Sequence, residues 1–343
     1  GPDVGDAWRR VGRDAFAVES RAIEWRLAVI GALVSAGPLA VGAAAGRVDA
    51  GLYAGLGGLN VGLAVSGSSL RRRAVRGATT LGGAVAATVL ATTLHPSALL
   101  SVVATAVIVT VLALTAAGDR QDALVGFVVS AVFVIVNGLA GDASDALARA
   151  LQFGAGGAVA FGLFLLVASD VAEPDDRSSI GSVVARTARS AGHPVRRHAA
   201  RVGVATSIGT ALYRALGLAF GYWIPLTTLA VLQPDGHASR VRAVQRTTGT
   251  LVGTAAVAAV AAATDSRAVL IALVAGCAFG LFALRGRSYH WLVALLTPTA
   301  LLMIATRTGA SDQLVTDRLA NTAIGVAVAV AAATIAVGTR PTR

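Results

Sequence analysis

Charge and cysteine are both scarce in this sequence of 343 residues. Only 14% of the residues are charged and one, Cys277, is a cysteine, whereas soluble domains carry roughly 25% charged residues. So few charges cannot cover the water-facing surface of a 34.3 kDa globule, which excludes a soluble enzyme of ordinary composition. A single cysteine excludes an internal disulfide framework and a cysteine-based metal site. Lysine is absent, so all 29 basic residues are arginine.

Apolar residues make up 55% of the sequence, and the mean hydropathy is +0.71. They gather in runs close to the length of about 17–25 residues that a transmembrane helix needs. We therefore predict an all-α membrane protein with about twelve transmembrane helices. The predicted spans are 27–45, 50–66, 74–94, 97–117, 123–140, 147–169, 199–213, 215–232, 246–263, 268–284, 291–306 and 314–337.

The arginines predict an orientation for these spans, because basic residues are retained on the cytoplasmic side of a membrane. If both termini are cytoplasmic, the outer loops hold six acidic residues and only six of the 29 arginines. The whole excess of +11 charges then lies on the inner face. We expect a multi-pass protein of the inner (plasma) membrane. The six outer arginines are Arg47, Arg149, Arg214, Arg267, Arg307 and Arg318.

The two halves of the sequence resemble each other. A shift of 170 residues aligns Arg72 and Arg76 with Arg242 and Arg246, and a shift of 169 aligns Arg149 with Arg318. Six spans in each copy give both copies the same orientation in the membrane, with a pseudo-twofold axis along the membrane normal. We predict two parallel six-helix repeats, at 27–169 and 199–337, which make a pseudo-dimer within one chain.

Three segments lie outside these repeats. Residues 1–26 place Trp8, Val11, Ala15, Val18, Ala22 and Trp25 at alternating spacings of three and four, which predicts an amphipathic helix lying along the inner membrane surface in contact with lipids. Residues 170–198 are polar and are expected to be a cytoplasmic linker. Residues 338–343 are expected to be a short C-terminal tail.

One motif, at 221–253, is similar to the signature of the FUSC family, the fusaric acid resistance and aromatic acid exporter group of membrane proteins. The matching residues are Tyr222, Trp223, Leu226, Thr227, Pro234, Arg242, Arg246, Gly249, Thr250 and Gly253. The resemblance implies a transporter that exports small organic anions, and aromatic carboxylic acids are the first candidates for its substrate. The first repeat keeps a degenerate copy of the motif, with Tyr53 aligned to Trp223 and Gly55 to Pro225.

The start of this motif predicts a contact for an aromatic ligand. Proline removes a backbone donor, so Pro225 is expected to disrupt the helix near Trp223 and Thr227 and to leave carbonyl and hydroxyl groups facing a cavity. An aromatic ring can stack on Tyr222 or Trp223. The alternative is that these two rings belong to the aromatic belt at the membrane interface.

Two pairs of an arginine and an amide are the sharpest candidates for binding an anion. Arg149 is followed by Gln152, and Arg318 by Asn321, each near the start of a span. Polar groups at membrane depth usually face a cavity or one another, so the two guanidinium groups are predicted to converge near the axis and hold one carboxylate. In the alternative they are structural, with Arg149 paired to Asp145, and Arg318 to Asp312 or Asp317.

Four arginines near the inner ends of spans are predicted to attract anions from the cytoplasm. Arg72, Arg76, Arg242 and Arg246 form two pairs spaced i, i+4. The alternative is that they extend to lipid phosphates. Asn60 and Asn137 lie in the middle of spans without a charge nearby and are expected to bond between helices.

No motif for a metal, cofactor or nucleotide is recognised, so we predict neither a cofactor nor an enzyme, and no nucleic-acid partner. Almost no carboxylate lies at mid-membrane depth, so we expect the membrane potential to drive an anion outward. The potential favours this movement by about 2.3 kcal/mol per charge per 100 mV. A proton gradient is the alternative driving force. Two further functions stay open: an anion channel or uptake route, and a protein or enzyme that handles anionic lipids.

Overall fold

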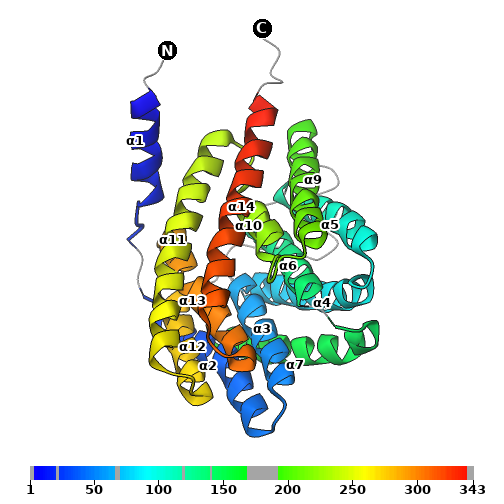
Figure 1. The fold of residues 1–343 in the computed structure, drawn as a ribbon, viewed down its shortest axis with the longest axis vertical. Coiled ribbons are helices and arrows are strands. Elements are labelled where there is room, and N and C mark those ends of the chain that lie inside the picture. Colours follow the sequence, from blue (N-terminus) through cyan, green and yellow to red (C-terminus); the bar gives the residue numbers. More distant parts are fainter. Residues whose placement is uncertain are drawn as a thin grey trace.

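The computed structural model describes residues 4–20, 23–65, 70–117, 120–139, 141–167 and 192–337, and every regular element in these ranges is a helix (Figure 1). The predicted tail and almost all of the predicted linker lie outside the described residues. The helices are α1 (Val4–Ala15), α2 (Trp25–Ala44), α3 (Val48–Ala64), α4 (Leu70–Leu94), α5 (Ala98–Ala113), η1 (Leu114–Ala117), α6 (Arg120–Gly138), η2 (Ala143–Asp145), α7 (Ala146–Leu166), α9 (His193–Leu216), α10 (Trp223–Val231), α11 (Gly236–Ala263), α12 (Arg267–Ala283), α13 (Tyr289–Thr308) and α14 (Asp312–Val337).

Six helical segments in the described part of the chain are long and apolar enough to cross a membrane. They are α2, α4, α5 with η1, η2 with α7, α13 and α14. Two more apolar helical segments are shorter. They are Asp122–Gly138, which is part of α6, and the whole of α12. Each of the twelve predicted spans overlaps a helix, but the number of membrane crossings stays a prediction.

The predicted span at 215–232 is not one continuous helix, and that prediction is wrong. Gly217 ends α9 in the left-handed conformation, with a φ of 61°, and Phe220 also has a positive φ of 50°. The following helix, α10, has nine residues, so at 1.5 Å per residue it is roughly 14 Å long. Hydropathy missed this break because the turn is itself apolar. All nine residues of α10 are buried, so this helix lies in the protein core.

The N-terminal amphipathic helix is shorter than predicted. It ends at Ala15, and Trp25, assigned to the same pattern, begins α2 instead. Val11 and Ala15 are buried against α11, whereas Trp8 is exposed. The predicted linker is also shorter than expected, because its last residues, from His193 on, belong to α9. Pro194 lies in the first turn of α9, where a backbone N–H would have no acceptor within the helix.

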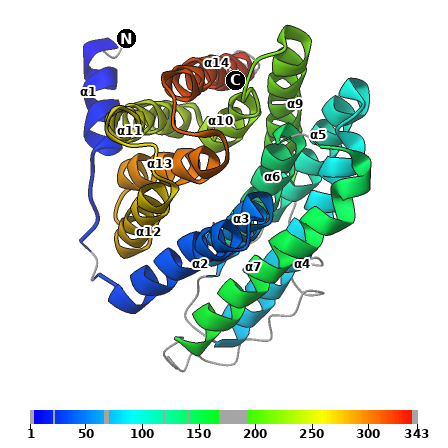
Figure 2. The same ribbon diagram turned by 60° about the horizontal axis from the view of Figure 1, so that its bottom comes forward.

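The helices of the two halves pack in corresponding pairs. In the first half α3 packs on α2 and α7, and α4 packs on α6 and α7; in the second half α10 packs on α9 and α14, and α11 packs on α13 and α14. The halves meet where α2 lies along α12 and where α5 lies along α9 (Figure 2). Each half therefore places its second helix, α3 or α10, against its sixth, α7 or α14.

Only one of the two mid-span asparagines links helices. The Asn137 amide donates to the Ser101 hydroxyl at 3.2 Å and accepts from the Tyr213 hydroxyl at 3.2 Å, which joins α6 to α5 and α9. Asn60 instead donates to the Leu56 carbonyl of its own helix at 2.9 Å. The expected interhelical role is confirmed for Asn137 and wrong for Asn60.

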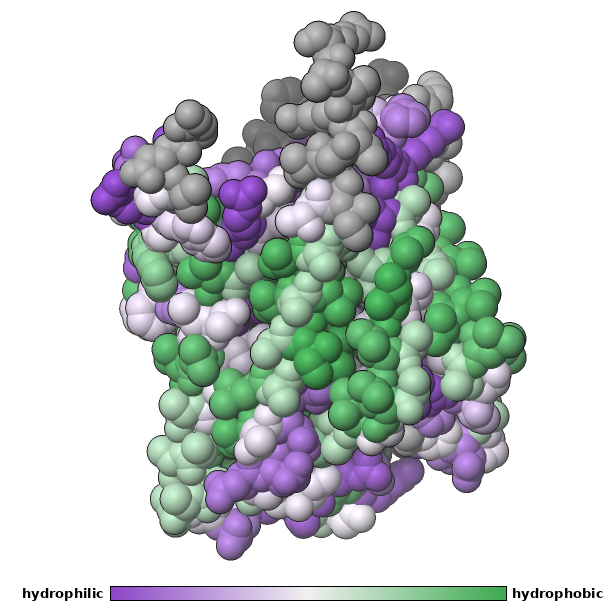
Figure 3. All heavy atoms as spheres, turned by 45° about the horizontal axis from the view of Figure 1, so that its top comes forward, coloured by the Kyte–Doolittle hydropathy of each residue, from purple (hydrophilic) through white to green (hydrophobic). Residues whose placement is uncertain are grey.

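Hydrophobic side chains form a band across the visible face of the molecule, between two hydrophilic ends (Figure 3). Several large apolar residues on the outer helices are exposed, among them Leu99, Val107, Leu147 and Leu166. In water such a surface would favour aggregation, whereas in a bilayer it faces the hydrocarbon chains. α1 and the end of α14 lie at one end of the molecule, and the α2–α3 turn lies at the other (Figure 1).

Candidate functional site

Arg318, on the second turn of α14, is the most deeply buried charged side chain among the described residues. It is 1% exposed, and its Cζ atom lies 3.7 Å from the centroid of the Trp223 ring at the start of α10. Its Nε and Nη1 atoms are buried and find no hydrogen-bond acceptor in the described part of the chain. A cation–π contact contributes about 2 kcal/mol when desolvated, well short of the cost of burying a cation without a counter-charge. This arginine therefore favours an anion beside it.

A second aromatic ring and a second arginine extend this site. Tyr222 packs against Trp223 with ring centroids 4.9 Å apart, and the Tyr222 hydroxyl and Trp223 Nε1 are buried without a partner among the described residues. Arg246 of α11 is 4% exposed, and its Nε atom is also unpartnered among the described residues. Its positive charge repels the positive charge of Arg318. We call Tyr222, Trp223, Arg246 and Arg318 the central site. In the described structure it holds two buried cations and no carboxylate.

Burial overturns one alternative reading of the motif. Tyr222 and Trp223 are 1% and 4% exposed, so they do not form an aromatic belt at the membrane surface. A Cβ atom at Gly138 of α6 would collide with the Tyr222 ring, which shows how closely α6 of the first half approaches this ring. The aromatic pair therefore lies at the contact between the two halves.

Pro225 does not disrupt a helix, and that prediction is wrong. It occupies the first turn of α10, where a missing N–H costs little. Thr227 is fully buried, with its Oγ1 unpartnered in the described residues, and its Cβ packs on Gly325 of α14. Asn321 is occupied as well, because its amide donates to the Ala219 carbonyl at 3.0 Å and holds the turn before α10.

Arg149 of α7 repeats the arginine–aromatic contact in the first half, with a carboxylate added. Its Cζ lies 5.2 Å from the Tyr53 ring of α3, and its Nη2 lies 3.1 Å from Asp145 Oδ2. The expected pairing of Arg149 with Asp145 is therefore confirmed. In the described residues Arg318 has no ion pair with Asp312 or Asp317, and Asp317 accepts a hydrogen bond from Gln313 instead. The two guanidinium groups have separate partners rather than one shared site.

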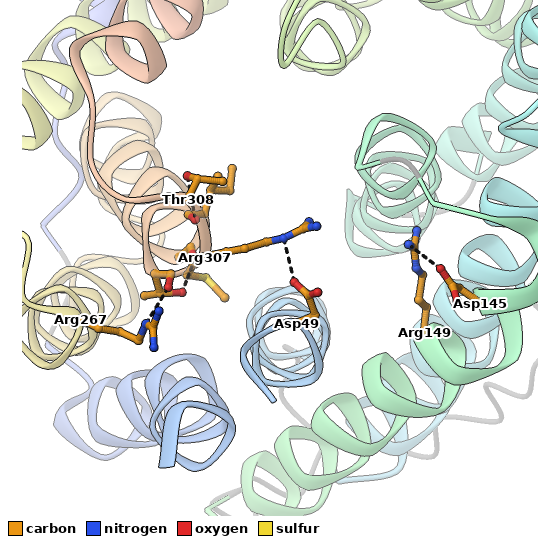
Figure 4. A network of polar contacts seen from close by, with 9 residues as sticks. Asp49, Asp145, Arg149, Arg267, Arg307 and Thr308 are labelled. Atoms are coloured by element: carbon orange, nitrogen blue, oxygen red, sulfur yellow. Dashed lines mark hydrogen bonds and ion pairs between the residues drawn. The ribbon is translucent and has the colours of Figure 1, made fainter. Parts of the chain in front are cut away.

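A charged vestibule opens beside Arg149. We use this name for the pocket of about 380 Å³ lined by residues 46–50, Gln152 and Arg307. Arg307 Nε lies 2.8 Å from Asp49 Oδ1, an ion pair that joins α13 of the second half to α3 of the first. Figure 4 shows Arg307 reaching Asp49 on α3, with the Arg149–Asp145 pair apart from it to one side. Tyr53 lies one turn beyond Asp49 and interacts electrostatically with the residues of both the Arg307–Asp49 and the Arg149–Asp145 pair.

The four arginines predicted to collect anions differ in their surroundings. Arg76 is buried and lies 3.6 Å from Asp122 of α6, so it neither collects anions nor reaches lipid. Arg242 is half-buried, with its Cζ 3.9 Å from the Tyr289 ring centroid. Arg72 is half-buried on the first turn of α4. Arg246 belongs to the central site.

Two glycines mark equivalent crossings in the two halves. A Cβ atom at Gly156 of α7 would collide with the Ala54 carbonyl of α3, and one at Gly325 of α14 would collide with the Ile224 carbonyl of α10. Gly156 and Gly325 are aligned by the shift of 169, and Ala54 and Ile224 by the shift of 170. The same close approach therefore sets each arginine over its ring.

Several residues of the site were not found from the sequence. Asp49, Asp122, Arg307 and Tyr289 lie far along the chain from the groups that they contact. Only Tyr53 had a signal, through its alignment with Trp223. Pairs of this kind need a fold, because no local spacing connects their members.

Residues 206–332 match a family of proteins described as fusaric acid resistance protein-like. The inner membrane protein YccS of Escherichia coli (strain K12) is 34% identical over 139 residues, which are 40% of this chain and 19% of YccS. The uncharacterized protein YhfK of the same strain is 30% identical over 138 residues, with the same coverage of both chains. An uncharacterized protein of Neisseria gonorrhoeae, ORF2, is 42% identical over 59 residues, or 17% of this chain and 14% of its own. The chain thus spans about a fifth or less of these relatives, and no solved structure matches it.

Proposed function

We propose that this chain, of which residues 206–332 match the fusaric acid resistance protein-like family, is a membrane transporter that exports small organic anions across the inner membrane. Aromatic carboxylic acids are the first candidates for the cargo. The observation that carries the proposal is Arg318, a buried cation that rests on an aromatic ring and has no carboxylate partner in the described chain.

The central site offers each part of an aromatic acid a suitable contact. A carboxylate accepts hydrogen bonds from the unpartnered N–H groups of Arg318, which are strong because both partners are charged. The ring of the cargo packs beside Tyr222 and Trp223 at the contact between the halves. Arg246 adds a second positive charge, so the cargo also relieves the repulsion between two buried cations.

We also infer the duplicated architecture, with twelve crossings in two parallel repeats. Three features support it: the corresponding helix pairs, the aligned glycine crossings at Gly156 and Gly325, and the aligned rings of Tyr53 and Trp223 under Arg149 and Arg318. In this arrangement the aromatic pair lies near the pseudo-twofold axis, where transporters built from repeats place their binding sites.

The proposed route runs from the cytoplasmic end of α11 to the vestibule. Arg242, over Tyr289, receives the anion, Arg246 and Arg318 bind it within the membrane, and the vestibule releases it outside. A membrane potential that is negative inside favours this movement by about 2.3 kcal/mol per charge per 100 mV. A proton gradient is the alternative source of energy.

Flux through liposomes tests the proposal. Purified protein should carry benzoate under an imposed voltage, with saturation at high concentration, and Arg318→Gln should abolish most of this flux while the protein stays folded. Arg240→Gln is the matched control, because it removes the same charge from an exposed position on α11. Equal losses in both variants, or no benzoate flux in the wild type, would contradict the proposed function. Unitary current steps without saturation would instead indicate a channel.

A further inference from the structure

The central site differs from the vestibule, taken together with the neighbouring Arg149–Asp145 pair, in how its arginines are paired. In the vestibule Arg307 pairs with Asp49 at 2.8 Å, and its neighbour Arg149 pairs with Asp145 at 3.1 Å. The central site has no such carboxylate among the described residues. An anion that leaves the central site therefore moves from two cations without a carboxylate partner to a region where Arg307 and Arg149 are each paired.

The ion pairs of the vestibule can exchange partners. Asp49 and Arg307 are 61% and 45% exposed, and Asp145 is 49% exposed. Partly exposed pairs of this kind are weak, because water screens both charges. A carboxylate of the cargo can replace Asp49 or Asp145 on its arginine for a short time, and the resident carboxylate can then displace it.

Such displacement solves a problem that a cationic route would create. Conduction needs sites that attract an ion strongly enough for entry and weakly enough for departure. Arg149, Arg307 and Arg47 without carboxylates would hold an anion at the end of its route. Asp49 is paired with Arg307 in the vestibule (Figure 4), and this pairing limits that attraction.

We infer that Asp49 and Asp145 are release residues, which compete with the cargo carboxylate for Arg307 and Arg149 and so free the anion from the vestibule. The expected cargo at this second station is a monoanionic carboxylate, held by guanidinium groups and by Gln152. This inference rests on the proposed function. It assigns the vestibule a role in turnover rather than in initial recognition.

The test is the kinetics of benzoate efflux from liposomes at pH 7 for Asp49→Asn. The amide keeps the shape of the side chain and removes its charge, so Arg307 attracts the anion without competition. We expect KM and kcat to fall together by about three- to tenfold, because charge-assisted contacts slow dissociation. Asp145→Asn should change both values in the same direction through Arg149, and it tests the inference should Asp49→Asn fail to fold.

Two further variants separate electrostatic competition from structure. Asp265→Asn makes the same charge change in the exposed α11–α12 turn, at the same end of the molecule but outside the vestibule (Figure 1), and should behave as the wild type. The double variant Asp49→Asn/Arg307→Gln removes both charges and should restore KM and kcat toward their wild-type values. A merely structural role of the ion pair would make the double variant no better than the single one.

The outcomes distinguish the inference from the function on which it rests. If the wild type carries no benzoate, or Arg318→Gln changes nothing, the proposed function and this inference both fail. If Arg318→Gln abolishes flux but Asp49→Asn matches Asp265→Asn, raises kcat or is not rescued by the double variant, the release role alone is overturned.

Discussion

The two halves of the molecule build the same contact and give it different charges. In each half the sixth helix crosses the second at a glycine, Gly156 or Gly325, and lays an arginine over a ring. The first-half arginine, Arg149, has Asp145 as an ion-pair partner, and Arg76 has Asp122. Their counterparts Arg318 and Arg246 have no carboxylate partner in the described residues.

This difference separates buried arginines that have a carboxylate partner from buried arginines that have none among the described residues. A buried cation paired with a carboxylate has its charge largely neutralised within the protein. A buried cation without a partner is stabilised when an anion binds beside it, and the protein can use this free energy for binding. In the duplicated architecture that we propose, the two copies share one framework, and the second copy keeps its charge available.

The largest expected effect is on stability, in the pair Arg76→Gln and Arg246→Gln. Removing Arg76 breaks its buried ion pair with Asp122, which costs about 3–5 kcal/mol. Removing Arg246 relieves its repulsion with Arg318 and should leave the stability unchanged or raise it. Unfolding in mixtures of mild detergent and SDS measures both. A larger loss for Arg246→Gln would reverse the comparison.

The next effect is on binding, when the second half is given the carboxylate of the first. Leu314 precedes Arg318 by four residues, as Asp145 precedes Arg149, and it is buried. Leu314→Asp should neutralise Arg318 from within and weaken benzoate binding by about ten- to a hundredfold, since a charged hydrogen bond contributes ~1.5–3 kcal/mol.

The control for this transplant is Leu314→Asn, which has the same shape without the charge. Isothermal titration calorimetry with benzoate compares the two variants. The asparagine variant should bind more tightly than the aspartate variant at pH 7. Equal affinities would show that the charge of Arg318 does not hold the anion.

A smaller effect concerns the choice between aromatic and aliphatic acids. Trp223→Leu removes the ring under Arg318 and should lower the preference for benzoate over acetate by about three- to tenfold, the range of one aromatic contact. Tyr53→Leu removes the corresponding ring under Arg149 and should leave that preference unchanged. Competition of both acids against labelled benzoate checks this. An equal change in the two variants would make the halves equivalent in recognition.

The smallest effect separates stability from binding within the second half. Asp235 caps α11 by accepting hydrogen bonds from the backbone N–H groups of Ala238 and His237, each at 2.9 Å, and these bonds lower the pKa of its carboxyl group. Asp235→Ala should cost about 0.5–1 kcal/mol of stability and leave benzoate affinity unchanged.

The sign of the pH dependence follows from that lowered pKa. Stabilisation by the Asp235 carboxylate is present above its unfolded pKa, about 3.9, and is lost as the pH falls through the lower folded pKa. The stability difference between wild type and Asp235→Ala should therefore shrink below about pH 4. A difference that grows on acidification would contradict the capping role.

Much of the fold could be predicted from hydropathy, since each predicted span overlaps a helix. The turn at Gly217–Phe220 could not, because it is as apolar as the helices beside it and its positive φ angles leave no trace in hydropathy. The extent of α1 was also wrong: a spacing of three and four continued to Trp25 although the chain leaves the helix after Ala15.

The site was predictable where its partners are close in sequence. The i, i+4 spacing of Asp145 and Arg149 predicted their ion pair. The motif at 221–253 predicted that Trp223 and its neighbours belong to the site. The Asp49–Arg307 and Arg76–Asp122 pairs join distant segments and could not be read from spacing. The proposed function depends on the lack of a carboxylate beside Arg318, and only the packed structure shows that none of the distant carboxylates in the described residues lies there.

The most direct test is a structure of the protein with 4-iodobenzoate, whose iodine is located by anomalous scattering. The account predicts a carboxylate bound to Arg318 with the iodinated ring beside Tyr222 and Trp223, and none in place of Asp145 on Arg149. An occupied site at Arg149 with an empty one at Arg318, or no bound acid at saturating concentration, would contradict it.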